Sequence, residues 1–314
     1  MNLPDKGALL DILKGGTATL ALYLASISLP LAGVLPGVFS PLPAIYYGLK
    51  NGRSAALAIV LLTTALLAFI AGPTGALVFM AQSGLIAIAF PFLLGRGWGA
   101  GRAMVGSVAV AFCSILIVAA IYWATQGIDP SKTVRGWIDS GMSQSSALYE
   151  KSGITGEELK TLQQGVKEAG NLIARIYPAL VLAGLGAIAG FNLLALKGIA
   201  ARLGRMSPVG DFRRFRNPDH LIWLLIVAGF ALLINNDVVS TAALNLLAVL
   251  LPLYFLQGLA IIIHYLDQFR VNWLFRVIFF VLLAIQPYLL IAVAVFGIFD
   301  LWGNFRTPKK RENL

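Results

Sequence analysis

The chain has almost none of the side chains from which disulfides, thiolate metal sites and histidine-based catalytic sites are built. Cys113 is the single cysteine and lies in an apolar run, so the sequence predicts neither an internal disulfide nor a thiolate metal centre. His220 and His264 are the only histidines. We therefore expect no metal site and no cofactor.

Charged residues are scarce as well. They make up 12% of the 314 residues, while 58% are hydrophobic and the mean hydropathy is +0.82; a soluble domain carries about 25% charged residues. This composition predicts a polytopic membrane protein whose first partner is the lipid bilayer. The net charge of +10 is explained by basic residues in cytoplasmic loops, so it does not imply that nucleic acid is a partner.

Known catalytic motifs are also missing. The sequence has no Walker A motif, no HExxH motif and no pair of carboxylates within an apolar segment. Alternating glycines surround Trp98, but no strand precedes them and their spacing differs from the dinucleotide fingerprint. These absences predict that the protein is not an enzyme.

Long apolar runs dominate what is present. A spanning helix needs about 20 apolar residues. On this rule we count nine segments, within a range of eight to ten: 8–28, 30–49, 54–72, 74–95, 102–125, 172–197, 219–236, 239–265 and 274–303. The expected fold class is therefore an all-α, polytopic transmembrane helix bundle.

The last segment is too long for one straight span. Its 30 residues would make a helix of about 45 Å, against a hydrocarbon core of roughly 30 Å, and Pro287 lies near the middle. The sequence leaves open whether this segment bends back, and so on which side the tail lies.

Basic residues are distributed unevenly along the chain. With the N-terminus inside, the short outer connections near 29–40, 71–75 and 235–238 hold no lysine or arginine, whereas the inner loops are rich in both. This asymmetry predicts a multi-pass membrane protein with a cytoplasmic N-terminus.

A proline-rich stretch, 36–53, is embedded among apolar segments. Pro36, Pro41 and Pro43 interrupt the helical hydrogen-bond ladder. Freed carbonyls inside a bilayer need partners from neighbouring protein or trapped water. We therefore expect this stretch to pack against other helices.

The insert 126–171 is the one sizeable stretch without a span, and we expect it to be extracytoplasmic. Thr155 and Glu158 have capping-box spacing. Two apolar faces at helical spacing flank them, one of Val134, Trp137, Ile138 and Met142, the other of Leu159, Leu162, Val166, Ala169 and Ile173. The sequence is consistent with two amphipathic helices on the membrane surface or with a lid over a cavity.

The inner loop 198–218 carries the densest positive charge. Arg213, Arg214 and Arg216 alternate with Phe212 and Phe215. Such a pattern suits anchoring at an anionic leaflet, and it also suits contact with a cytoplasmic partner. RNA binding is disfavoured, because no nucleic-acid module surrounds the cluster.

Polar residues within the last two segments are the remaining candidates. Tyr254, Gln257, Ile261, His264 and Gln268 share one helical face. The polar members of this face can hydrogen-bond to a neighbouring helix, or His264 and Asp267 can form a proton or ion path. Asp300 and Arg306 have the spacing of an ion pair at a helix end.

The stretch 36–53, the order of the first six segments and the tail Gly297-Ile-Phe-Asp-Leu-Trp-Gly-Asn-Phe-Arg306 together resemble the YybS-like family of uncharacterised bacterial membrane proteins. This resemblance implies that the protein lies in the bacterial plasma (inner) membrane. The first six segments also resemble the S-components of energy-coupling-factor transporters, six-helix substrate binders that open outward. This second resemblance implies a transmembrane coupling subunit and ATPases as partners, contacted through a small-residue face at Ala21 and Ala25. The insert and three extra segments depart from the S-component pattern.

These observations predict two domains, an S-component-like region at 1–200 and a basic loop with three further spans at 201–314. The leading function is binding of a small anionic solute, as the substrate-recognition part of a transporter. Its expected pocket lies at the outer level of the first six segments and is formed by Phe39, Tyr122, Trp123, Arg175 and Tyr177. The alternatives are an interfacial aromatic belt for these residues, and a membrane scaffold that binds a cytoplasmic partner through 198–218.

Overall fold

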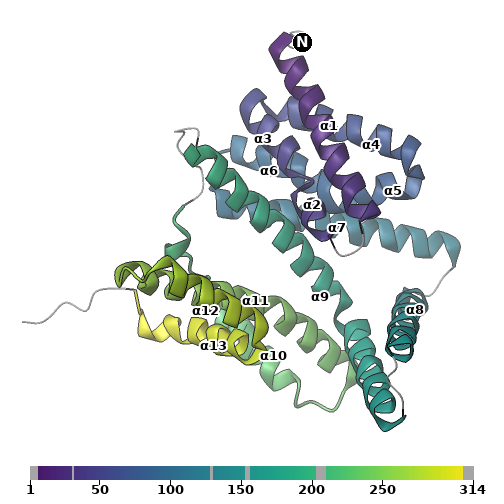
Figure 1. Ribbon diagram of the computed structural model, residues 1–314, viewed down its shortest axis with the longest axis vertical. Coiled ribbons are helices and arrows are strands. Elements are labelled where there is room, and N and C mark those ends of the chain that lie inside the picture. Colours follow the sequence, from purple (N-terminus) through teal and green to yellow (C-terminus); the bar gives the residue numbers. More distant parts are fainter. Residues whose placement is uncertain (1–5, 30–31, 128–129, 153–155, 203–209, 307–314) are drawn as a thin grey trace, which may run out of the picture. The chain divides into compact units, whose positions relative to one another are not determined.

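The computed structural model describes residues 6–29, 32–127, 130–152, 156–202 and 210–306. These residues form helices and connecting turns, and no strand occurs among them (Figure 1). The chain divides into two compact units. Unit 1 comprises residues 1–128 and 181–210, and unit 2 comprises residues 129–180 and 211–314.

Each unit is a set of helices. Unit 1 contains α1 (Lys6–Ser28), α2 (Val34–Phe39), α3 (Leu42–Asn51), α4 (Arg53–Ile70), α5 (Gly72–Phe79), the π-helix η1 (Met80–Gly84), α6 (Leu85–Gly95), α7 (Ala100–Gln126) and the end of α9 (Gly156–Arg202). Unit 2 contains α8 (Pro130–Lys151), the beginning of α9, the 3-10 turn η2 (Phe212–Arg214), α10 (Leu221–Ala231), α11 (Asp237–Gln268), α12 (Trp273–Ile285) and α13 (Pro287–Gly303). The domain boundary expected near residue 200 stays a prediction.

The described helices confirm the all-α membrane bundle. Six of them are long and apolar enough to cross a membrane: α1, α4, the continuous run α5–η1–α6, α7, α9 and α11. The other three predicted segments are also helical but short or broken. Segment 30–49 is divided between α2 and α3, segment 219–236 contains α10, and segment 274–303 forms α12 and α13, which are bent by 105°. The number of spans therefore depends on how such broken segments are counted.

The proline-rich stretch obtains its hydrogen bonds from neighbouring helices, as expected. In unit 1 the Asn192 side chain on α9 donates to the Val38 carbonyl at 2.7 Å. The Ser40 hydroxyl donates to the Gly37 carbonyl at 2.9 Å and lies 2.8 Å from the Ser83 hydroxyl on η1. Ser40, Ser83 and Asn192 are fully buried, so protein groups replace water where the prolines break the helix.

Close helix packing in unit 1 involves a face of α1 other than the one with Ala21 and Ala25. A Cβ atom on Gly15 would lie 2.5 Å from the Ile59 side chain on α4, so glycine is needed for this approach. Ala21, by contrast, is exposed and Ala25 is half-buried. The face with Ala21 and Ala25 is thus outside the core of unit 1, and its contact with a coupling subunit stays a prediction.

The closest helix contact in unit 2 joins α11 and α13. A Cβ atom on Gly297 would lie 2.0 Å from the Tyr254 carbonyl oxygen, and one on Gly258 would lie 1.9 Å from the Val293 carbonyl oxygen. The two backbones therefore touch, as small residues allow in membrane helices. This contact fixes the position of α13 against α11.

The predicted insert forms a helical hairpin of α8 and the first turns of α9. Gly170 on α9 lies against Met142 and Ile138 on α8, and Val134 is buried. The predicted apolar faces therefore meet each other. Thr155 lies outside the described residues, and whether the hairpin lies on a membrane or covers a cavity stays a prediction.

The break in α9 at Pro178 is bridged by a side chain from α11. Asn245 donates from Nδ2 to the Arg175 carbonyl at 2.7 Å and accepts at Oδ1 from the Ala179 amide at 3.1 Å. These two groups are four residues apart, which is the spacing of a helical hydrogen bond. Asn245 therefore links α11 to α9 by hydrogen bonds, as is typical of a polar residue in an apolar segment.

Candidate functional site

A basic pocket of about 460 Å³ lies at one end of unit 2. Its walls come from the loop that precedes α10 and from the final turns of α11 and α13. The lining residues are Asp211, Arg213, Arg214, Arg216, His264, Asp300, Asn304 and Arg306. The three arginines of the predicted basic loop therefore surround one pocket, together with charged and polar groups from the last segment.

A buried carboxylate forms the floor of this pocket. Asp300 is 1% exposed and accepts at Oδ2 from Arg306 at 2.6 Å and from the Gln257 amide at 3.1 Å. Its Oδ1 accepts from the backbone N–H of Phe305 at 3.1 Å. Gln257 in turn accepts from the backbone N–H of Asn217 at 3.0 Å. The predicted Asp300–Arg306 pair is thus confirmed, and Gln257 does contact a neighbouring helix.

Arg306 ties the basic loop to the end of α13. Besides its ion pair with Asp300, it donates through one terminal nitrogen to the carbonyls of Arg213 and Phe215, at 2.9 and 2.7 Å. The Tyr265 hydroxyl on α11 donates to the Phe305 carbonyl at 2.6 Å. Of the two alternatives for segment 274–303, these contacts support the bent one, because α13 ends where α11 ends.

Arg213 is held by acidic neighbours. It donates from Nε to both carboxylate oxygens of Asp211, at 2.9 and 2.7 Å, and from a terminal nitrogen to Asp267 at 3.2 Å. The hydrogen bond with Asp211 raises the pKa of the Arg213 guanidinium, with Asp267 as a further cause. Asp267 also pairs with Arg276. The positive charge of Arg213 is therefore balanced within the protein, and its side chain is fixed.

Arg216 and Arg214 are less constrained. The terminal nitrogens of Arg216 donate to Asn304 at 2.8 Å and to Asp219 at 3.2 Å, and this carboxylate is 69% exposed at its side chain. Arg214 is exposed; its backbone N–H donates to the Asp211 carbonyl at 3.0 Å, but its side chain forms no hydrogen bond or ion pair with any residue that the structure describes. Its guanidinium has five N–H donors, so it can bind an external carboxylate or phosphate in a bidentate way.

The residues predicted to form an outer pocket belong to different units. Phe39, Tyr122 and Trp123 lie in α2 and α7 of unit 1, and the Tyr122 side chain is 54% exposed. Arg175 and Tyr177 lie in α9 within unit 2. The Arg175 side chain donates to Ser240 at 3.0 Å and to Thr241 at 3.2 Å on α11. A shared site for these five residues stays a prediction.

Sequence reasoning missed the contributions of Asn217 and Asn304. The Asn217 side chain donates to the Leu253 carbonyl at 2.9 Å, which ties the basic loop to α11. Asn304 adopts a left-handed conformation with φ of 40° and ends α13. The sequence did contain one signal for each, since asparagine before proline favours a turn and asparagine is common at the left-handed end of a helix.

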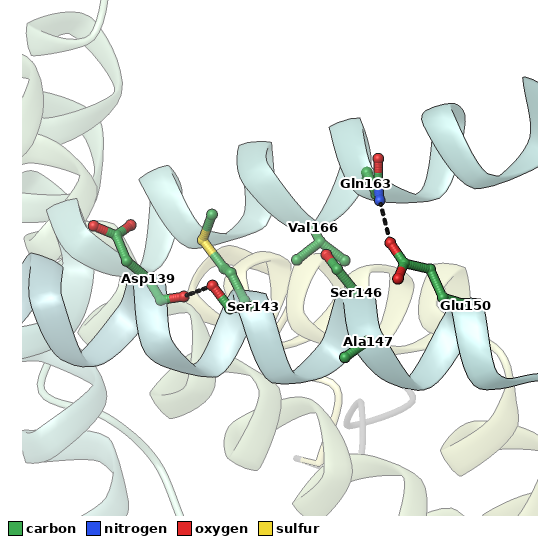
Figure 2. A pocket seen from close by; sticks show the side chains of 8 residues that line it. Asp139, Ser143, Ser146, Ala147, Glu150, Gln163 and Val166 are labelled. Atoms are coloured by element: carbon green, nitrogen blue, oxygen red, sulfur yellow. Dashed lines mark hydrogen bonds between the residues drawn. The ribbon is translucent and has the colours of Figure 1, made fainter.

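A second hollow, of about 440 Å³, lies between α8 and α9 (Figure 2). Two carboxylates, Asp139 and Glu150, are among the residues that line it. Glu150 accepts from the Gln163 amide at 3.4 Å, and the Ser143 hydroxyl donates to the Asp139 carbonyl at 2.9 Å. This hollow combines fewer charged groups than the basic pocket, which we therefore take as the candidate site.

Comparison with known proteins gives a family but no characterised relative. No curated protein and no solved structure matches this chain. The resemblances to the YybS-like family and to S-components stay expectations. Residues 17–301 match the model of a family described as predicted membrane protein, DUF2232, and because this match covers most of the sequence, the chain belongs to that family.

Proposed function

We propose that this chain is a non-enzymatic membrane protein that binds a small anionic ligand in the basic pocket of unit 2. The observation that carries the proposal is a difference among the four arginines of the pocket: some are bound by aspartates, and Arg214 is not. Arg213 and Arg306 are fixed by Asp211, Asp267 and Asp300, whereas Arg214 forms no such bond with the described residues. In such a pocket the fixed arginines hold the walls in place, and the N–H donors of Arg214 remain available to a ligand.

Electrostatics favour an anion over a neutral solute. The pocket lining holds four arginines and two aspartates. Arginine is the side chain best suited to carboxylates and phosphates, because its planar fork matches two oxygens at once. A ligand bound there would replace water around Arg214 and accept a hydrogen bond from Nε of Arg216, which donates to none of the residues that the structure describes.

The finer form of the proposal is substrate recognition within a transporter. A transmembrane coupling subunit and ATPases would then be partners. The exposed Ala21 and half-buried Ala25 on α1 support such a contact, since a small-residue face outside the core can receive another helix.

Arg214→Ala is expected to abolish stabilisation by anions without affecting the fold. Charge-assisted hydrogen bonds contribute about 1.5–3 kcal/mol, so binding should weaken about 10- to 100-fold. The measurement is thermal unfolding of the purified protein with inorganic phosphate, glycerol 3-phosphate or succinate. Arg135→Ala, which removes an exposed charge from α8, is the matched control. If none of these anions stabilises the wild type more than Arg214→Ala, the proposal is wrong.

A scaffold that binds a cytoplasmic partner through 198–218 is the second candidate, and the exposed position of Arg214 favours it. Pull-down in mild detergent distinguishes the transporter role from the scaffold role. Co-purification of a coupling subunit with ATPases supports the transporter role. Co-purification of a soluble protein that Arg214→Ala releases supports the scaffold.

We further propose that the hairpin of α8 and α9 is extracytoplasmic and that the N-terminus is cytoplasmic. Ser152 is exposed just after α8. In a Cys113→Ala background, Ser152→Cys should react with an impermeant maleimide in intact spheroplasts. Labelling that requires lysis would reverse the orientation and place the basic pocket outside.

A further inference from the structure

Large aromatic side chains surround the end of unit 2 that holds the basic pocket. Trp302 lies in the last turn of α13, Phe269 follows α11, and Trp273 begins α12. They are 64%, 70% and 72% exposed. Tryptophan is enriched where a membrane helix passes from hydrocarbon to headgroups. Trp302 and Trp273 therefore mark the headgroup level at the same end of the helices as the pocket.

A pocket at that level meets the headgroups of the surrounding lipid as well as solutes from the water. The pocket has a rigid basic wall, and the guanidinium of Arg214 has no partner among the described residues. Two groups add to it: Arg216, whose Nε donates to no residue in the described part of the chain, and the half-buried His264, which lines the pocket. These donors suit tetrahedral phosphate oxygens, which several donors can approach from different directions. Basic pockets between membrane helices are known to bind lipid headgroups.

We infer that the basic pocket binds a phosphate group and that its source is the headgroup of an anionic phospholipid. This inference rests on the proposed function, because it names the class of anion. The headgroup phosphate contacts Arg214 and Arg216, while the acyl chains of the same lipid lie along the apolar surface of the helices, at the level that Trp302 and Trp273 mark. A free phosphate ester offers the same oxygens to Arg214 but has no acyl chains.

The experiment compares the two phosphate sources on the full chain purified in a neutral detergent. Binding of phosphatidylglycerol is measured by native mass spectrometry, and binding of glycerol 3-phosphate by thermal stabilisation. Phosphatidylcholine is the control lipid, since its choline cancels the phosphate charge. The variants are Arg214→Ala, Arg214→Lys, Trp302→Ala and the matched control Arg135→Ala.

We expect phosphatidylglycerol to bind in preference to phosphatidylcholine. Arg214→Ala should weaken binding of both phosphatidylglycerol and glycerol 3-phosphate by about 10-fold or more. Arg214→Lys should restore part of it, because lysine keeps the charge and loses the planar fork. Trp302→Ala, at a position two residues from both Asp300 and Asn304 and so on the other face of the helix end, should change neither. Arg135→Ala should change neither as well.

Two results would overturn the inference. In the first, glycerol 3-phosphate binding depends on Arg214 but phosphatidylglycerol binds no better than phosphatidylcholine; the proposed function then stands, with a water-soluble ligand. In the second, lipid binding is the same in wild type and Arg214→Ala, which shows that lipid is held elsewhere. Failure of both phosphate sources and of succinate would instead remove the proposed function itself.

Discussion

Replacing Gly297 by leucine is expected to unfold unit 2 in detergent. Even a Cβ atom at this position would lie 2.0 Å from the Tyr254 carbonyl oxygen and 2.7 Å from the Gly258 nitrogen. Both are backbone atoms, so α11 and α13 would have to separate as a whole. Overpacking of a core costs about 1–3 kcal/mol, and we expect Gly297→Ala to reach the upper end of this range and Gly297→Leu to exceed it.

The measurement is thermal or SDS-induced unfolding followed by tryptophan fluorescence. Gly229→Ala on α10 is the matched control, since a Cβ atom there meets nothing within 4 Å. Removing a mid-helix glycine at an open site should be neutral or stabilising by up to about 1 kcal/mol. Equal stability of Gly297→Ala and Gly229→Ala would contradict the close contact of α11 and α13.

Replacing Asp300 by alanine is expected to cost about 3–5 kcal/mol, as for other buried ion pairs that lose one partner. The Asp300 and Arg306 side chains are 2% and 15% exposed. Without the carboxylate, the Gln257 amide and the Phe305 N–H lose their acceptor, and the Arg306 guanidinium loses its counter-charge although it keeps its two carbonyl acceptors. The basic loop should then detach from α13, and anion-dependent stabilisation should disappear as well.

A double-mutant cycle makes this prediction specific. Asp300→Ala with Arg306→Ala should cost less than the sum of the single changes, because the double variant leaves no unpaired buried charge. Asp219→Ala is the control. It removes an exposed partner of Arg216, and such surface pairs contribute about 0–1 kcal/mol. Additive costs for Asp300 and Arg306 would show that the pair is not coupled.

The sequence by itself determined the class of protein and its helical segments. All nine predicted apolar segments contain helix, because hydropathy and length are local properties that need no knowledge of neighbours. The pair Asp300–Arg306 was also predictable, since both residues belong to one helix end. The role of the prolines near residue 40 followed from the backbone alone, which must find acceptors and donors wherever a helix breaks in an apolar environment.

Tertiary structure alone decided which glycines make close helix contacts and which arginines are fixed by ion pairs. The sequence contains 32 glycines, and nothing local distinguishes Gly297, which touches another backbone, from Gly229, which touches nothing. The arginines of the basic loop likewise look alike along the chain. Arg213 is fixed by Asp211, two residues away, and by Asp267, which approaches the loop from a segment more than fifty residues away, whereas the Arg214 side chain has no such partner among the described residues. Contacts of that kind depend on how the helices pack, which is why the position of the pocket could not be predicted from the spacing of its residues.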